Sequence, residues 1–165
     1  MTATIRRAER QDLPAVRDLL VATWHATYDA TLGVDVVNDV TSRWHTVERL
    51  AQQLDRPDEL FLVAHAVDGL RATASAARGK DGRVAIERLY VLPAAQGQGL
   101  GRRLMTAIEQ HFADATEYTL EVEPQNRQAI AFYEALGFRK VGGGTACGGD
   151  SKAAIAHAIM TRAAR

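Results

Sequence analysis

The chain has 165 residues, and its 20 lysines and arginines balance 20 aspartates and glutamates, so the formal charge at pH 7 is zero. A neutral chain offers no basic field to nucleic acid or to an anionic membrane surface, and neither is expected as a partner. The first residues are polar and no apolar run is long enough to span a bilayer, which favours a cytoplasmic protein with a single domain over residues 1–165.

The first half of the chain predicts strands and helices separated by short turns. Strands are expected at residues 4–7, 60–66 and 71–77. Asp12 is a candidate N-cap for a first helix, and a second helical region is expected over residues 36–54, with a break or bend around residues 41–44. The Asp81-Gly82 step then favours a tight hairpin into the next strand.

The segment after this hairpin predicts a strand over residues 84–92, a loop with three glycines at alternate positions, and an amphipathic helix over residues 99–113. Backbone N–H groups at a helix start are unpaired and lie at the positive end of the helix dipole. Glycine removes the Cβ atoms that would keep a ligand away from them, so the segment predicts a pyrophosphate cradle. A glycine-rich turn without a ligand is the alternative. The dinucleotide pattern G-x-G-x-x-G fails, because Arg102 stands where the third glycine belongs.

The last third predicts a strand over residues 118–122, a helix over residues 127–136 and a final strand over residues 154–159. Asn126 is a candidate N-cap, and Gly137 a candidate left-handed residue after the helix. The glycine-rich stretch 142–149 leaves the penultimate strand unplaced. Alternating strands and helices predict an α/β arrangement with a mixed sheet.

Two motifs together resemble the GNAT superfamily of acyl-CoA-dependent N-acetyltransferases. The first is Gln-x-x-Gly-x-Gly, formed by Gln96, Gly99 and Gly101, and the second is Asn-x-x-Ala-x-x-Phe-Tyr-x-x-x-Gly-Phe, from Asn126 to Phe138. The resemblance covers essentially the whole chain. It implies the GNAT fold, with a mixed central sheet of about seven strands flanked by about four helices. It also implies acetyl-CoA as the co-substrate.

Expected cofactor-binding residues lie in the strand, the glycine loop and the second motif: Leu89, Tyr90, Val91, Gln96, Gly97, Gln98, Gly99, Leu100, Gly101, Arg102, Asn126 and Phe132. Backbone N–H groups of residues 89–91 are expected to hold the thioester carbonyl, if the strand bulges there and separates from residues 118–122. No metal site is expected, because Cys147 is the only cysteine and the five histidines are scattered.

Attack on a thioester requires a neutral amine, so the site needs a base. Glu87 is the candidate, because strict alternation would place it on an apolar row with Ala85, Leu89 and Val91, where a carboxylate loses hydration. In several members of the superfamily a glutamate at this offset from the glycine loop is the base; a structural salt bridge is the alternative role. Two further carboxylates are fallback candidates for the base: Glu121 and Glu123.

The departing thiolate needs a proton donor, and Tyr133 is the candidate acid, since a tyrosine hydroxyl ionises near pH 10. A packed aromatic ring is the alternative role for Tyr133. Trp24, His25 and Tyr28 are candidate walls for the acceptor amine, although aromatics at helical spacing also form cores.

The predicted function is transfer of an acetyl group from acetyl-CoA to a primary amine, by direct attack in a ternary complex. The expected partner is a small-molecule amine, and assembly as a homodimer is left open. Alternatives are a protein lysine or N-terminal acetyltransferase, and a non-catalytic acyl-CoA sensor, for which Glu87 and Tyr133 would be unnecessary. Residues 22–32, 86–88 and 148–150 are loosely similar to those of bacterial polyamine acetyltransferases.

Overall fold

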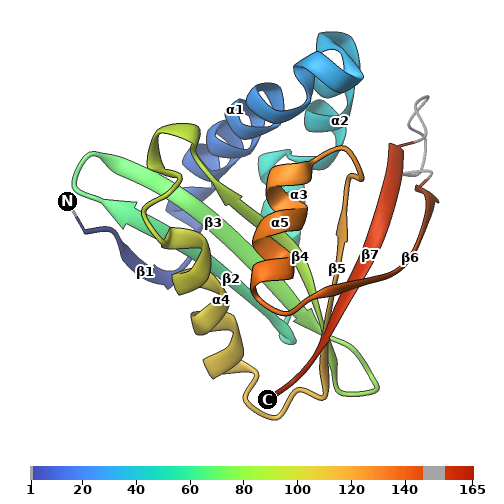
Figure 1. The fold of residues 1–165 in the computed structure, drawn as a ribbon. Helices are drawn as coiled ribbons and strands as arrows, with labels where there is room; N and C mark the ends of the chain where they lie inside the picture. The colour runs from blue at the N-terminus through green and yellow to red at the C-terminus, as the bar shows by residue number, and fades with distance from the viewer. Residues whose placement is uncertain (1, 147–154) are drawn as a thin grey trace.

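The structure is a computed structural model, and it describes residues 2–146 and 155–165. In these residues seven strands form one mixed sheet in the order β1-β2-β3-β4-β5-β7-β6 (Figure 1). The strands are β1 (Thr4–Arg7), β2 (Glu59–Ala66), β3 (Gly69–Arg78), β4 (Arg83–Val91), β5 (Glu117–Val122), β6 (Arg139–Ala146) and β7 (Ile155–Ala163). The α-helices are α1 (Leu13–Leu32), α2 (Val34–Trp44), α3 (Val47–Leu54), α4 (Leu100–His111) and α5 (Arg127–Ala135).

The helices cover both faces of the sheet, with α4 and α5 on one face and α1, α2 and α3 on the other (Figure 1). The apolar stripe of α4, including Leu104 and Ile108, packs with Leu62 of β2 in the larger core. On the opposite face, Leu20 of α1 and Leu50 of α3 pack against Val63 of β2. Strand residues alternate between the two cores, as the side-chain period of two requires.

The contact between β4 and β5 is the parallel junction of the sheet. It consists of four residue pairs, from Arg83 with Glu117 to Ile86 with Leu120, where the ladder ends. At the next residue, Glu87, β4 carries a bulge, because Ser75 of β3 faces Arg88 whereas Ala76 faces Ile86. The bulge and the separation, on which the expected role of residues 89–91 depends, are both present and begin at Glu87, two residues before Leu89.

The fold class is confirmed, with one difference in the helices. The helical region expected over residues 36–54, with a break or bend around residues 41–44, is broken just after them into α2 and α3, which gives five α-helices among the described residues where about four were expected. His45 leaves the helical conformation at φ −108° and ψ 37°, and the Thr46 hydroxyl caps α3 by accepting a hydrogen bond from the Arg49 N–H.

The penultimate strand, unplaced from the sequence, is β6, which runs through the glycines. A Cβ atom at Gly143 would lie 2.7 Å from the His157 carbonyl oxygen of β7, so this close approach requires glycine. Cys147 and residues 148–150 lie outside the described residues. No helix of the described part of the chain is long and apolar enough to cross a membrane.

Candidate active site

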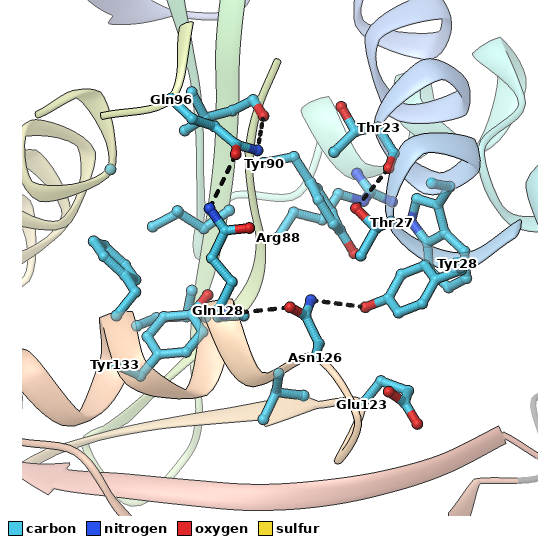
Figure 2. A pocket seen from close by; sticks show the side chains of 18 of the residues that line it. Thr23, Thr27, Tyr28, Arg88, Tyr90, Gln96, Glu123, Asn126, Gln128 and Tyr133 are labelled. Atoms are coloured by element: carbon cyan, nitrogen blue, oxygen red, sulfur yellow. Dashed lines mark hydrogen bonds between the residues drawn. The ribbon is translucent and has the colours of Figure 1, made fainter. Parts of the chain in front are cut away.

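A cavity of about 840 Å³ opens where β4 and β5 separate (Figure 2). Its walls come from α1, α2, β4, β5, the start of α4, α5 and β7. Fifteen of the predicted site residues line it: Trp24, Tyr28, Glu87, Leu89, Tyr90, Val91, Gln96, Gly97, Gly99, Leu100, Gly101, Arg102, Asn126, Phe132 and Tyr133. A second cavity of about 410 Å³ adjoins it and shares residues such as Tyr28, Glu123 and Asn126.

Two of the predicted residues do not line the large cavity. His25 lies on another face of α1, where its Nδ1 is 2.7 Å from an Asp29 carboxylate oxygen. Gln98 is exposed, and its side chain donates back to the Ala94 carbonyl. Both are neighbours of cavity residues in the chain, and the helix and the loop turn their side chains elsewhere.

The backbone of the glycine loop lines one end of the cavity. Gly97 and Gly99 have φ values of 76° and 78°, in the left-handed region that glycine favours, and nothing lies within 4 Å of a Cβ built at either. Gly99 is the N-cap residue of α4, so the N–H groups of the following residues begin the helix without intrahelical acceptors. Arg102, exposed on the first turn, adds a cation to this end.

Gly101 is a glycine for a different reason. A Cβ atom there would lie 2.9 Å from the Phe132 ring of α5. The third glycine therefore permits the close contact between α4 and α5 beside the cavity, whereas the first two shape the loop.

The N–H groups of Leu89 and Val91 point into the gap between β4 and β5. The Leu92 N–H donates to the Arg71 carbonyl of β3, so Leu92 belongs to a hydrogen-bonded pair of this antiparallel ladder. Such pairs alternate along a ladder, which directs the amides of Leu89 and Val91 away from β3. These two donors can hold an oxygen that gains negative charge.

Tyr133 is buried in the wall opposite this strand, with 8% of its surface exposed. Its ring packs against Phe132 and Phe138, at centroid distances of 5.2 and 5.7 Å. Burial, assisted by the neighbouring tyrosines, raises the pKa of Tyr133 above its usual value. The hydroxyl thus stays protonated in the neutral range, as a proton donor must.

Glu87 lies on the cavity wall, but not on the apolar row that alternation predicted. The bulge shifts the phase of β4, so Leu89 and Val91 pack toward the α4 core while the Glu87 carboxylate meets Gln53 of α3. Glu87 is exposed, so the expected loss of hydration is wrong. The fallback carboxylates Glu121 and Glu123 line the same cavity.

The α1 side of the cavity is aromatic. The Trp24 ring lies 4.7 Å from Tyr28 and 5.5 Å from His45, and all three line the wall together with Trp44. Burial and the nearby Arg88 charge lower the pKa of His45 to about 3, so its ring is neutral at pH 7. This wall can enclose a small organic group without adding charge.

Two side-chain bridges cross from α5 to the other walls (Figure 2). Gln128 Nε2 donates to Gln96 Oε1 of the glycine loop at 3.1 Å. The Asn126 amide donates to the Tyr28 hydroxyl of α1 at 3.3 Å, while its oxygen caps α5 by accepting the Ala129 N–H. The predicted N-cap thus also joins α5 to α1.

Sequence reasoning missed several residues of this site: Thr23, Thr27, Arg88, Gln128, His157 and the buried Gln53 behind Glu87. The i, i+4 spacing of Thr23 with Thr27, on the α1 face next to Trp24 and Tyr28, could have shown the first two. Arg88 could not have been found by alternation, because the bulge changes the face. No group of three or more side chains suited to a metal occurs among the described residues.

Solved structures share this architecture. The PaiA N-acetyltransferase of Thermoplasma acidophilum, solved in complex with coenzyme A, superposes with a TM-score of 0.83, at 21% identity and 99% coverage of both chains. The ribosomal-protein-S18-alanine N-acetyltransferase of Escherichia coli gives a TM-score of 0.73 at 21% identity, covering 98% of this chain and 94% of the other.

Curated relatives match over shorter segments. The mycothiol acetyltransferase of a Nocardioides species is 38% identical over 107 residues, which is 55% of this chain and 36% of the relative. The spermine/spermidine N(1)-acetyltransferase of Bacillus subtilis is 33% identical over 63 residues, 36% of this chain and 41% of the relative. The matched segments thus span about two fifths or less of the relatives' lengths.

The family comparison covers the α1 wall, the bulged strand, the glycine loop and the α5 motif in one match. Residues 14–138 match the model of the Acetyltransferase (GNAT) family, and the chain therefore belongs to this family of acyltransferases.

Proposed function

We propose that this protein transfers an acetyl group from acetyl-CoA to the primary amine of a small molecule, by direct attack within a ternary complex. The observation that carries the proposal is one continuous cavity. It joins the glycine loop, the inward-pointing amides of β4, Tyr133 and Glu87 to an aromatic acceptor wall. Family membership supports acyl transfer, and the site supports the roles of the residues.

The donor fits the end of the cavity at α4. The free N–H groups after Gly99 and the Arg102 guanidinium suit the pyrophosphate of acetyl-CoA. The gap is lined by the apolar side chains of Leu89, Val91 and Phe132, with backbone amides along one side, which suits an extended amide-containing arm. Acetyl-CoA supplies the activated acetyl group when it is bound.

The acceptor fits the opposite side. Glu87, Glu121 and Glu123 give this side three carboxylates, and the arginine that lines it, Arg88, donates to Gln53. Carboxylates beside aromatic rings favour a cationic amine. The curated relatives named for spermine/spermidine and for mycothiol point to small acceptors as well.

The residues divide the proton transfers between them. Glu87 accepts a proton from the acceptor ammonium, directly or through water, and the neutral nitrogen forms a bond to the thioester carbon. The amides of Leu89 and Val91 hold the carbonyl oxygen as its charge grows. As the carbon–sulfur bond breaks, Tyr133 donates its proton to the departing thiolate, and the attacking nitrogen releases its second proton to water. The products are the N-acetylated amine and CoA, and exchange with solvent removes the proton from Glu87 and restores the tyrosine proton.

A turnover screen tests the proposal. Purified protein with acetyl-CoA is offered spermidine, an aminoglycoside, free lysine and a peptide, and release of free thiol is measured. We expect turnover with at least one small amine and thermal stabilisation by acetyl-CoA and CoA, but not by NAD or ATP. Turnover of the peptide alone would favour protein acetylation. Stabilisation by CoA without turnover of any amine would favour a sensor.

A further inference from the structure

A buried glutamine lies behind the bulged strand. Gln53 is on the last turn of α3, on the helix face whose Leu50 and Leu54 pack in the core. It is only 5% exposed, although glutamine is mostly found at protein surfaces. A buried amide on an apolar helix face needs partners for its donors and its acceptor.

Those partners are the residues around the bulge. Gln53 Nε2 donates to Glu87 Oε2 at 2.7 Å and to Ser75 Oγ of β3 at 3.2 Å. Arg88 Nη1 donates to Gln53 Oε1. Both protons of the amide nitrogen and one lone pair of its oxygen are therefore directed at three side chains of β3 and β4.

The bulge explains why such a contact matters. Glu87 is the extra residue of β4, opposed by no residue of β3, and its side chain is exposed. A carboxylate at such a position has rotational freedom that strand pairing does not remove. The hydrogen bond from the Gln53 amide to Oε2 restricts the orientation of the carboxylate at the cavity wall.

Several charged side chains lie close to the Gln53 amide. Glu59 of β2 has a buried side chain, with 1% exposed, and lies near Gln53, Glu87 and Arg88 as well as Arg56. The amide thus lies between two carboxylates and the Arg88 guanidinium. Replacing it with a carboxylate would add a like charge, and replacing it with an apolar chain would remove the donor to Glu87.

We propose that Gln53 is a positioning residue for acetyl transfer, which orients the Glu87 carboxylate, and the neighbouring Arg88, for proton removal from the acceptor amine. This inference rests on the proposed role of Glu87 as the base. Gln53 itself does not touch the substrate. It acts by limiting the rotamers of Glu87 from beneath the cavity wall.

The test is a double-mutant cycle with a matched control. Gln53→Met keeps the chain length and removes the amide, and Gln52→Met makes the same change at the exposed neighbour on α3. We expect Gln53→Met to lower kcat/KM for the best amine of the screen by about tenfold to a hundredfold, the scale of losing a hydrogen bond to a charged group. The KM for acetyl-CoA should be unchanged, and Gln52→Met should match the wild type.

The cycle is completed in the Glu87→Gln background. If Gln53 acts through Glu87, Gln53→Met should cause little further loss there, about threefold or less, and its own deficit should shrink at high pH, where the amine is already neutral. Gln53→Asn, which keeps the amide but shortens its reach, should give a smaller loss and provides a second variant if Gln53→Met folds poorly.

The outcomes separate the two proposals. An unchanged rate in Glu87→Gln overturns the proposed base. A large loss in Glu87→Gln, with an equal and independent loss from Gln53→Met in both backgrounds, leaves the base in place and overturns the positioning role. A Gln53→Met protein that is folded and fully active overturns it as well.

Discussion

The two ends of the cavity are built in different ways. The donor end is formed by consecutive backbone, from the end of β4 through the glycine loop to the first turn of α4. The acceptor end is formed by side chains from α1, α2, α3, β4 and β5, brought together across the sheet. A site made of local backbone depends on a few φ angles, whereas a site made of distant side chains depends on contacts between elements.

This difference decides what each end tolerates. A side chain at the donor end can change if the backbone keeps its course, but a residue that cannot adopt a positive φ disrupts it. At the acceptor end, one substitution changes the charge or the orientation of a neighbour while the backbone stays the same. The predictions below test this contrast, from the largest expected effect to the smallest.

The largest effect is expected at Glu87. Glu87→Gln keeps the size and cannot take a proton, so kcat/KM at neutral pH should fall by about a hundredfold to ten-thousandfold. The fall should shrink at high pH, where the amine is already neutral. A pH–rate profile of both proteins measures this. A deficit that stays constant across pH would mean that Glu87 holds structure or substrate, and a larger loss in Glu121→Gln would move the base to β5.

Tyr133→Phe should lower kcat by about a hundredfold with little change in affinity for acetyl-CoA, because one proton donor is lost and the ring remains. Tyr118→Phe is the matched control. Tyr118 is also a buried tyrosine, but its hydroxyl donates to the Phe112 carbonyl at 3.2 Å, away from the cavity lining. Equal kcat values for Tyr133→Phe and the wild type would make Tyr133 a packing residue.

Gly99→Val tests whether the donor end is a backbone site. Gly99 has a φ of 78°, which a β-branched residue adopts only with strain, so the start of α4 should shift. We expect the variant to lose the thermal stabilisation by acetyl-CoA, which is about 2.7 kcal/mol at a hundredfold excess over Kd. Gln98→Ala, at the exposed neighbour, should keep it. An undiminished shift in Gly99→Val would contradict the backbone account.

Glu59, behind the acceptor side of the cavity, should make the stability of the protein depend on pH. Burial, and then the Glu87 charge, raise its pKa from 4.5 to about 7, although Gln53, Arg56 and Arg88 oppose this. The folded protein holds this proton more tightly than the unfolded chain, so stability should fall as the pH rises from about 4.5 through about 7.

Glu59→Gln mimics the protonated form. We expect it to be more stable than the wild type by about 2 kcal/mol at pH 8 and about equal at pH 5, measured by denaturant unfolding. Glu48→Gln, at an exposed position of α3, should show no such difference between the two pH values. A pH-independent gap between Glu59→Gln and the wild type would show that the carboxylate does not titrate in this range.

The contrast between the two ends also explains what the sequence could predict. The glycine loop and the Asn126 cap are local patterns, and the structure places them where expected. The face of Glu87 was assigned by alternation, which one bulge reverses, and a sequence does not mark a bulge. Gln53 lies 34 residues from Glu87 in the chain, and only the packing of α3 under β4 brings the two together.

The short junction between β4 and β5 has a consequence for how the chain folds. Strands β2, β3 and β4 follow one another through short turns, so their pairing closes small loops, whereas β4 meets β5 only after the crossover through α4. The four parallel residue pairs of the junction contribute little stabilisation to offset the entropy cost of closing this larger loop. The β2–β3–β4 meander should therefore form before the junction, and amide exchange should be faster at Leu120 than at Thr73. Because β5 contributes to its wall, the cavity should be complete only once the junction has formed.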